Sequence, residues 1–175
     1  APIVGGDLTR GDHLGITITV LGSTPAPLRR GGAQPGDTLW LTGQLGGPAL
    51  AIAAWSEGRQ PTPEARARFA RPVPRIREAQ WLARAGATAG IDISDGLGGD
   101  AGHLAAASGV RIAIDADALP RAPGADVPTA QRSGEEYELL VTTRSQLDPA
   151  AFQREFGLSL TRIGTVEPGD AGVDL

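Results

Sequence analysis

GIDISDGLGGD, at residues 90–100, is the stretch from which the fold of this chain can be worked out. Isoleucines alternate in it with Asp92 and Ser94, which predicts a β-strand with one buried face. A glycine-containing turn at Asp95 follows, and apolar residues then recur at helical spacing. Backbone N–H groups at a helix start favour anions, and carboxylates clustered beside them can hold a divalent cation. The stretch therefore indicates a strand, a turn and a helix that together form a site for nucleotide phosphate.

Similar patterns on both sides of this stretch predict an alternation of strands and helices. Predicted strands lie at residues 14–21, 38–42, 90–94, 110–115, 138–142 and 159–166, and predicted helices at 48–58, 62–71, 74–86, 97–108 and 147–156. Residues 119–128 are expected to form a proline-rich loop, and the tail after residue 166 is polar. Since the elements alternate, with an antiparallel pairing or two, we expect an α/β (α+β) sandwich, that is, a mixed sheet flanked by helices.

The composition excludes several classes of protein. The 175 residues suit one domain or slightly more, and 41% of them are hydrophobic, enough for a packed core. The chain has no cysteine, hence no disulfide or thiolate metal ligand, which fits a cytoplasmic protein. The net charge of −4 argues against general nucleic-acid binding, and we expect the arginine-rich residues 66–77 on solvated helix faces. No apolar run approaches the roughly 18 residues of a membrane span.

The first 24 residues resemble the end of a preceding domain. The chain opens without methionine on GGDLTRG, residues 5–11, and a strand is predicted directly after it. A domain rarely opens on a loop of the kind that contacts ligands, so we expect the chain to begin inside a larger protein. The predicted boundaries are residues 1–24 for the last strand or strands of a preceding domain and 25–175 for the α/β domain.

Two clusters of polar residues near the start of the chain are candidates for ligand binding. Paired glycines let a backbone approach a ligand closely, and the carboxylate of Asp7 beside Gly6 could take a metal ion. Arg30 adjoins a glycine-rich loop, where a guanidinium suits a phosphate. The structural alternatives are a turn capped by the aspartate and an ordinary exposed arginine.

Two further clusters lie around the central strand and before the strand at 138–142. Asp92 and Ser94 share a strand face, and Asp95 is placed to cap the following helix. A capped turn explains Asp95 but not Asp92, because an acid between two isoleucines of a buried strand is costly unless paired or metal-bound. The last cluster is SGEEYELL, where three glutamates precede a strand; its alternative is a solvated loop with Tyr137 in the core.

Six segments occur in an order that is typical of one enzyme family. They are GGDLTRG, ITITVLG, RRGGAQPGDTLWLTGQLGG, RPVPRIREAQWLARAGATAGIDISDGL, DAGHLAAASG and SGEEYELL. Together they resemble thiamine-monophosphate kinase, of the superfamily of aminoimidazole ribonucleotide synthetase-like ATP enzymes. Because they cover most of the chain, the resemblance is more specific than any single motif. It implies the C-terminal α/β domain of such an enzyme, with residues 1–24 left from a mostly absent N-terminal ATP- and metal-binding domain.

The resemblance implies ATP-dependent phosphorylation of thiamine monophosphate to thiamine diphosphate, by direct Mg²⁺-assisted transfer of the phosphoryl group. It also implies a homodimer when the N-terminal domain is present. No residue is assigned a catalytic role, because positioning and charge neutralisation do most of the work in phosphoryl transfer. The implied contacts are Gly6, Asp7, Arg30 and Ser94 for ATP, Asp7, Asp92 and Asp95 for Mg²⁺, and Glu135 for the thiamine substrate.

The sequence departs from the family pattern in three places. The GDDAA-like acidic motif of the N-terminal domain is absent, SGEEYEL replaces GGEDYEL, and the chain is short between residues 120 and 133 and at its end. We therefore expect the chain alone not to turn over. The alternatives are another ATP-dependent synthetase of the superfamily, a non-catalytic binding or assembly module, and a domain fragment that self-associates through an exposed apolar face.

Overall fold

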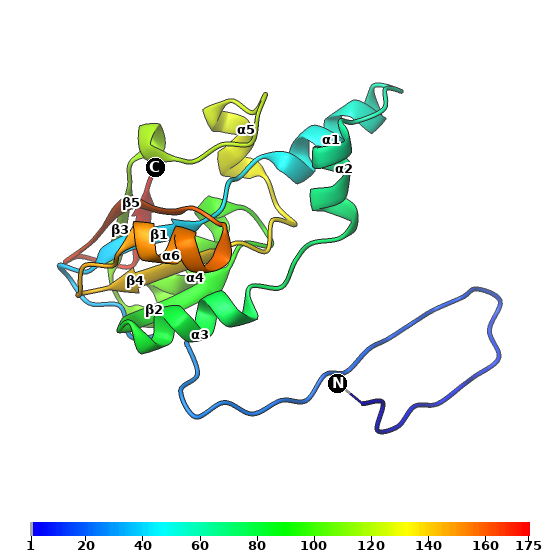
Figure 1. The fold of residues 1–175 in the computed structure, drawn as a ribbon, viewed down its shortest axis with the longest axis horizontal. Helices are drawn as coiled ribbons and strands as arrows, with labels where there is room; N and C mark the ends of the chain where they lie inside the picture. Colours follow the sequence, from blue (N-terminus) through cyan, green and yellow to red (C-terminus); the bar gives the residue numbers. More distant parts are fainter. Residues whose placement is uncertain (1) are drawn as a thin grey trace.

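A six-stranded sheet forms the centre of the molecule, shown in Figure 1 as a computed structural model that describes residues 2–175. Its strands are β1 (Thr38–Thr42), β2 (Ala87–Asp92), β3 (Arg111–Ile114), β4 (Leu139–Thr143), β5 (Leu160–Glu167) and β6 (Gly172–Asp174). Their hydrogen-bonded order is β2-β4-β1-β5-β3-β6. Neighbours are antiparallel except β3 and β6, which run parallel. The predicted mixed sheet is therefore confirmed, with the fully buried β1 inside it.

Helices cover both faces of this sheet, as expected of an α/β sandwich. They are α1 (Gly47–Ser56), α2 (Pro63–Ala70), α3 (Ile76–Arg84), α4 (Leu97–Ser108), α5 (Val127–Arg132) and α6 (Pro149–Phe156), with a 3₁₀ turn at Ala116–Ala118. Successive side chains of a strand point to opposite faces. Leu39 of β1 accordingly joins one core with Leu104 of α4. Trp40 points the other way and joins a second core with Leu82 of α3 and Phe152 of α6.

Local sequence signals account for where several helices begin and end. The Thr62 hydroxyl accepts a hydrogen bond from the Ala65 N–H (3.2 Å), and a proline opens α2. Asp148 caps α6 in the same way, and Gly157 follows that helix with φ 65°. The helices α1 and α2 pack against each other and project beyond the sheet (Figure 1). None of the helices in residues 2–175 is long and apolar enough to cross a membrane.

The strand expected at residues 14–21 is absent from the described structure, so that prediction is wrong here. Residues 2–27 have no regular secondary structure and are exposed throughout, and in Figure 1 this segment runs away from the sheet. Ile16, Ile18 and Val20 are 76%, 78% and 78% exposed. A strand needs a neighbour for its backbone N–H and C=O groups, and no described residue pairs with this segment. The apolar side chains of this alternating pattern are therefore not buried.

Three other elements differ from the sequence expectation. Helix α5 lies across the end of the expected loop at 119–128, and it begins where Asp126 accepts a hydrogen bond from the Thr129 N–H (2.8 Å). The expected polar tail contains β6, which is too short to show an apolar pattern and is held by pairing with β3. The helix expected from Pro74 starts at Ile76, and Arg75 occupies its N-cap position.

The second core depends on an aromatic contact that can be tested by mutation. Phe152 is 0% exposed and meets the Trp81 ring edge-to-face, with 5.4 Å between the ring centroids. We expect Phe152→Ala to lower the free energy of unfolding by about 3–5 kcal/mol, because it leaves a cavity in the core. Urea denaturation measures this loss. The control Phe69→Ala removes a ring that is 37% exposed, and it should cost clearly less; equal losses would contradict the packing described.

Candidate functional site

The turn after β2 and the segment before β4 lie side by side at one end of the sheet. Three backbone hydrogen bonds of 2.8 Å join them: Ile93 N–H to Glu138 O, Tyr137 N–H to Ile93 O and Glu135 N–H to Ser94 O. Two of the four predicted clusters therefore meet. The arrangement brings Asp92, Ser94 and Asp95, expected to bind ATP and metal, next to Glu135, expected to bind substrate.

Asp100, which was not among the predicted site residues, orders the turn. Its Oδ2 atom accepts hydrogen bonds from the backbone N–H groups of Ser94 (2.9 Å) and Asp95 (3.0 Å). Burial raises the pKa of Asp100, and the charges of Asp95 and Asp92 add to the rise, whereas the two backbone donors oppose it. The expected cap by Asp95 is wrong: Gly96 occupies the N-cap position of α4, and no side chain caps it. The role of Asp100 had a signal in the sequence, because an acid is favoured in the first turn of a helix and Asp100 occupies that turn in α4.

Asp92 is exposed, which corrects the argument that its burial must be compensated. The strand β2 alternates at this end, so Ile91 and Ile93 are buried while Asp92 points to solvent. No desolvation cost therefore falls on this carboxylate. Asp92 stays a candidate ligand because of where it lies, beside Asp95 and the Glu135 segment, and not because the fold leaves it unexplained.

Tyr137 was expected in the core, but it lies at this corner of the molecule. It is half-buried, and its hydroxyl donates a hydrogen bond to Glu135 Oε2 (2.7 Å). That hydrogen bond is the main cause that raises the pKa of Tyr137, with desolvation and the charges of Glu135, Asp92 and Asp95 adding to it. We call Asp92, Asp95 and Glu135 the acidic corner, since their charges act together on one phenol.

The acidic corner suits a partly protein-bound Mg²⁺ ion better than a closed metal site. Among residues 2–175, no group of three or more His, Cys, Asp or Glu side chains is placed to hold a metal ion. Mg²⁺ in phosphate-transfer sites, however, is usually bound by one or two carboxylates together with substrate phosphates and water. Asp92 and Asp95 could provide two such carboxylates, and they stay predicted Mg²⁺ ligands.

Glu138 and Glu136 lie behind the corner, where two arginines neutralise them. Both glutamates are 1% exposed. Arg75 holds Glu138 through two hydrogen bonds, Nη2 to Oε1 (2.7 Å) and Nε to Oε2 (3.0 Å). Arg68 Nη1 lies 2.9 Å from Glu138 Oε1, and the Thr42 hydroxyl donates to Oε2 (2.7 Å). Arg68 and Arg75 are thus part of a buried network and not of the solvated faces that the sequence suggested.

Glu136 ties the same network to the start of α1. Its Oε1 atom accepts a hydrogen bond from the Gly46 N–H, and its Oε2 lies 3.1 Å from Arg68 Nη2. Burial raises the pKa of Glu136, whereas hydrogen bonds from Ser133, Gly46 and Arg68 oppose the rise. Gly46 has φ 108° and precedes α1 directly, a conformation that favours glycine.

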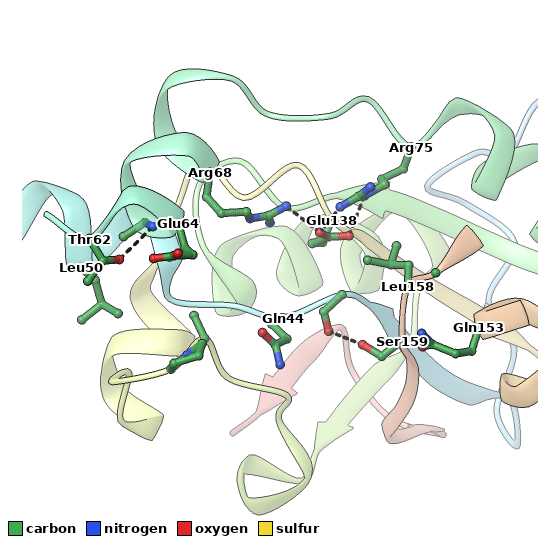
Figure 2. A pocket seen from close by; sticks show the side chains of 16 residues that line it. Gln44, Leu50, Thr62, Glu64, Arg68, Arg75, Glu138, Gln153, Leu158 and Ser159 are labelled. Carbon is green, nitrogen blue, oxygen red and sulfur yellow. Dashed lines mark hydrogen bonds and ion pairs between the residues drawn. The ribbon is translucent and has the colours of Figure 1, made fainter. Parts of the chain in front are cut away.

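A cavity of about 770 Å³ opens on the far side of Glu138 (Figure 2). Figure 2 shows Arg68 and Arg75 pointing toward Glu138 from one wall, with Gln44 and Ser159 across from them. The arginines there are already paired with glutamates, so the cavity offers no free positive charge to a phosphate. The cavity is lined by Gly43, Gln44, Gly47, Leu50, Thr62, Glu64, Ala65, Arg68, Arg75, Ala122, Pro123, Glu138, Gln153, Gly157, Leu158 and Ser159.

The two candidate clusters near the start of the chain lie apart from this corner. Gly6 and Asp7 are exposed, and the recorded side-chain hydrogen bond of Asp7 is local, from the Leu8 N–H to Oδ1 (2.9 Å). The structure therefore does not bring Asp7 to Asp92 and Asp95. Arg30 is exposed too; its carbonyl accepts a hydrogen bond from the Ser108 hydroxyl (3.1 Å), which anchors its loop to α4.

The fold is that of an α/β domain with a polar strand–turn–helix edge. Residues 34–174 match the family described as AIR synthase related protein, C-terminal domain. This match covers most of the chain, and the chain belongs to that family.

Thiamine-monophosphate kinases are among the proteins to which the chain is similar. The chain is 38% identical to the enzyme of Salmonella typhimurium over 98% of its own length and 58% of that protein. A crystal structure of thiamine-monophosphate kinase from Stenotrophomonas maltophilia K279a superposes with a TM-score of 0.77 and 37% identity, over 86% of this chain and 53% of that one. A structure described as AaThiL complexed with AMPPCP and TMP superposes with a TM-score of 0.70 and 31% identity, over 83% and 49%. The chain thus spans about half the length of these relatives.

The hydrogen bond between Tyr137 and Glu135 can be measured directly, because Tyr137 is the single tyrosine of the chain. We expect Glu135→Gln to lower the pKa of Tyr137, since it removes both the charged acceptor and its repulsion of the phenolate. Ultraviolet absorbance of tyrosinate during alkaline titration reports the change. Glu155→Gln, an exposed change on α6, serves as the control. An unchanged pKa in Glu135→Gln would show that the hydrogen bond does not form in solution.

Asp100 should make the stability of the domain depend on pH. Because folding raises the pKa of Asp100, the unfolded chain loses this proton first as the pH rises. We therefore compare the unfolding free energy of the native chain with that of Asp100→Asn. The difference, native minus variant, should fall as the pH rises through the ordinary pKa of an aspartate and then through the raised pKa of folded Asp100. Above the raised pKa the difference should stay constant. Urea denaturation at a series of pH values measures the difference. Asp117→Asn, an exposed site, controls for the lost charge; a difference that grows with pH would contradict the expectation.

Proposed function

We propose that the chain is the C-terminal part of an ATP-dependent thiamine-monophosphate kinase. The observation that carries this proposal is the contact between the turn after β2 and the Glu135 segment, where the Glu135 N–H donates to Ser94 O (2.8 Å). Similarity to thiamine-monophosphate kinases over nearly the whole chain supports it. The superposed relative described with AMPPCP and TMP supports ATP as the phosphoryl donor.

The proposed reaction transfers the terminal phosphoryl group of ATP to the phosphate of thiamine monophosphate. A phosphate oxygen of the acceptor forms a bond to the γ-phosphorus, the bond to the leaving oxygen of ADP breaks, and thiamine diphosphate results. Both reactants are anions, so their approach needs neutralising charge. Asp92 and Asp95 would hold Mg²⁺ here, and the ion would supply this neutralising charge. Asp100 keeps the turn in shape by binding its N–H groups, which leaves Ser94 in place to contact the nucleotide.

Glu135 suits the organic part of the substrate. Its side-chain partner in the structure is the hydroxyl of Tyr137 and not an arginine. The thiazolium ring of thiamine carries a positive charge, and a fixed carboxylate beside it favours binding. Glu135 would therefore orient the acceptor, while Asp92 and Asp95 act on the phosphates.

The rest of the predicted site requires more protein than these residues provide. Asp7, proposed as a further Mg²⁺ ligand and with Gly6 as an ATP contact, lies in the exposed N-terminal segment, and Arg30 is anchored to α4 and proposed to contact ATP phosphate. We propose that residues 1–24 belong with a preceding ATP- and metal-binding domain, and that the enzyme acts as a homodimer once that domain is present. The chain spans 58% of its Salmonella relative, in keeping with this proposal.

Calorimetric binding to the chain as it stands tests the proposal. We expect it to bind thiamine monophosphate, and to bind AMPPCP only with Mg²⁺ present. Asp92→Asn and Asp95→Asn should each weaken Mg²⁺·AMPPCP binding about tenfold, the equivalent of losing ~1.4 kcal/mol. Asp117→Asn is the matched control.

Three results would count against the proposal. Binding of AMPPCP that is indifferent to both aspartates would remove the acidic corner as the nucleotide site. Tighter binding of an acceptor other than thiamine monophosphate would favour another synthetase of the superfamily. Formation of thiamine diphosphate from ATP by this chain alone would show that the preceding domain is not required.

A further inference from the structure

The segment that carries Glu135 holds an uncommon backbone conformation. Glu135 has φ 57° and Tyr137 has φ 53°, and they are the non-glycine residues with positive φ in the described chain. Such residues persist only where the surrounding structure determines their conformation, and they are found mainly at functional sites. The contacts that impose this conformation therefore decide where the Glu135 carboxylate points.

One side of the segment is fixed by the turn after β2. The Glu135 N–H donates to Ser94 O and the Tyr137 N–H donates to Ile93 O, both at 2.8 Å. These bonds set the distance between the segment and the acidic corner. Glu136 lies between the two left-handed residues. Its backbone carbonyl points away from the turn after β2, toward α2.

Arg68 of α2 fixes that other side. Its Nη2 atom donates to the Glu136 carbonyl oxygen (3.0 Å) and to Glu136 Oε2 (3.1 Å). Its Nη1 lies 2.9 Å from Glu138 Oε1. A guanidinium has a rigid planar fork of donors, so it can hold a carbonyl and two carboxylates at fixed angles. Arg75 and the Thr42 hydroxyl donate the other hydrogen bonds that the Glu138 carboxylate accepts.

We propose that Arg68, supported by Arg75, is a positioning residue that holds residues 135–137 in a conformation with Glu135 and Tyr137 left-handed, and so aims Glu135 at the substrate. The role assigned to Glu135 rests on the proposed function; the role of Arg68 toward the segment does not. Buried ion pairs add little net stability compared with apolar packing. The geometry of this network, which grips the backbone between two strained residues, is its distinctive contribution.

The single tyrosine again provides the readout. With ¹³C-labelled tyrosine the chain gives one set of ring signals in an NMR spectrum, and these report where Tyr137 lies. In Arg68→Gln we expect the signals to move toward their positions in unfolded protein, and thiamine monophosphate to bind roughly tenfold more weakly. Binding of Mg²⁺·AMPPCP should stay within about twofold of the native value, because the turn after β2 keeps its own contacts with Asp100.

Two further variants separate positioning from plain stability. Arg66→Gln removes the same charge from an exposed position of the same helix, and it should leave the Tyr137 signals and both affinities unchanged. Arg68→Lys keeps the charge but replaces the fork with one nitrogen. It should shift the Tyr137 signals in the same direction as Arg68→Gln, by a smaller amount. It also keeps the test valid if Arg68→Gln does not fold.

A lower melting temperature in the Arg68 variants with native Tyr137 signals and native affinity for thiamine monophosphate would overturn the proposal, because Arg68 would then only stabilise the fold. Failure of the native chain to bind thiamine monophosphate would refute the proposed function instead. In that case the Tyr137 signals of Arg68→Gln, Arg68→Lys and Arg66→Gln still decide whether Arg68 positions the segment.

Discussion

The buried carboxylate of Glu138 fixes how the sheet and its helices meet. It accepts hydrogen bonds from Thr42 of β1 and from Arg75 ahead of α3, and it pairs with Arg68 of α2. The backbone carbonyl of Glu138 accepts a hydrogen bond from the N–H of Ile93, which directly follows β2. An unpaired buried carboxylate would be costly, so these partners are held together as a group. The turn, the Glu135 segment and the acidic corner are arranged around this group.

Local signals in the sequence predicted much of the fold. The apolar run of β1 and the Thr62 cap of α2 are decided within a few residues, and both are confirmed. The strand expected at 14–21 fails because a strand also needs a neighbour, which no local pattern can guarantee. Strand β6 was missed for the opposite reason: its pairing with β3 forms it without an apolar pattern.

The candidate site was predictable in its residue types but not in its geometry. Strand, turn and acidic residues around Asp92 stand out in the sequence, and the structure places Glu135 beside them through hydrogen bonds between segments some 40 residues apart along the chain. Asp92 is exposed because the second core, which covers its face of β2 at Gly90, does not reach the end of the strand, and the strand pattern does not tell this. Arg68 has no sequence feature that separates it from the exposed Arg66 on the same helix, so its burial beside two glutamates could only come from the folded chain.

The segment from Ser133 to Glu138 has two faces with different tasks. Glu136 and Glu138 point into the buried network. Glu135 and Tyr137 point outward, where Glu135 is part of the acidic corner and Tyr137 donates a hydrogen bond to it. Among related chains, the negative charge at the inward positions should therefore be lost only together with Arg68, because losing one partner alone leaves a buried charge unpaired. The outward positions carry no such internal charge balance, and what they can become is set by the ligand that they contact. One short stretch of backbone thus answers, residue by residue, to two independent demands: a charge balance inside the protein and a ligand outside it.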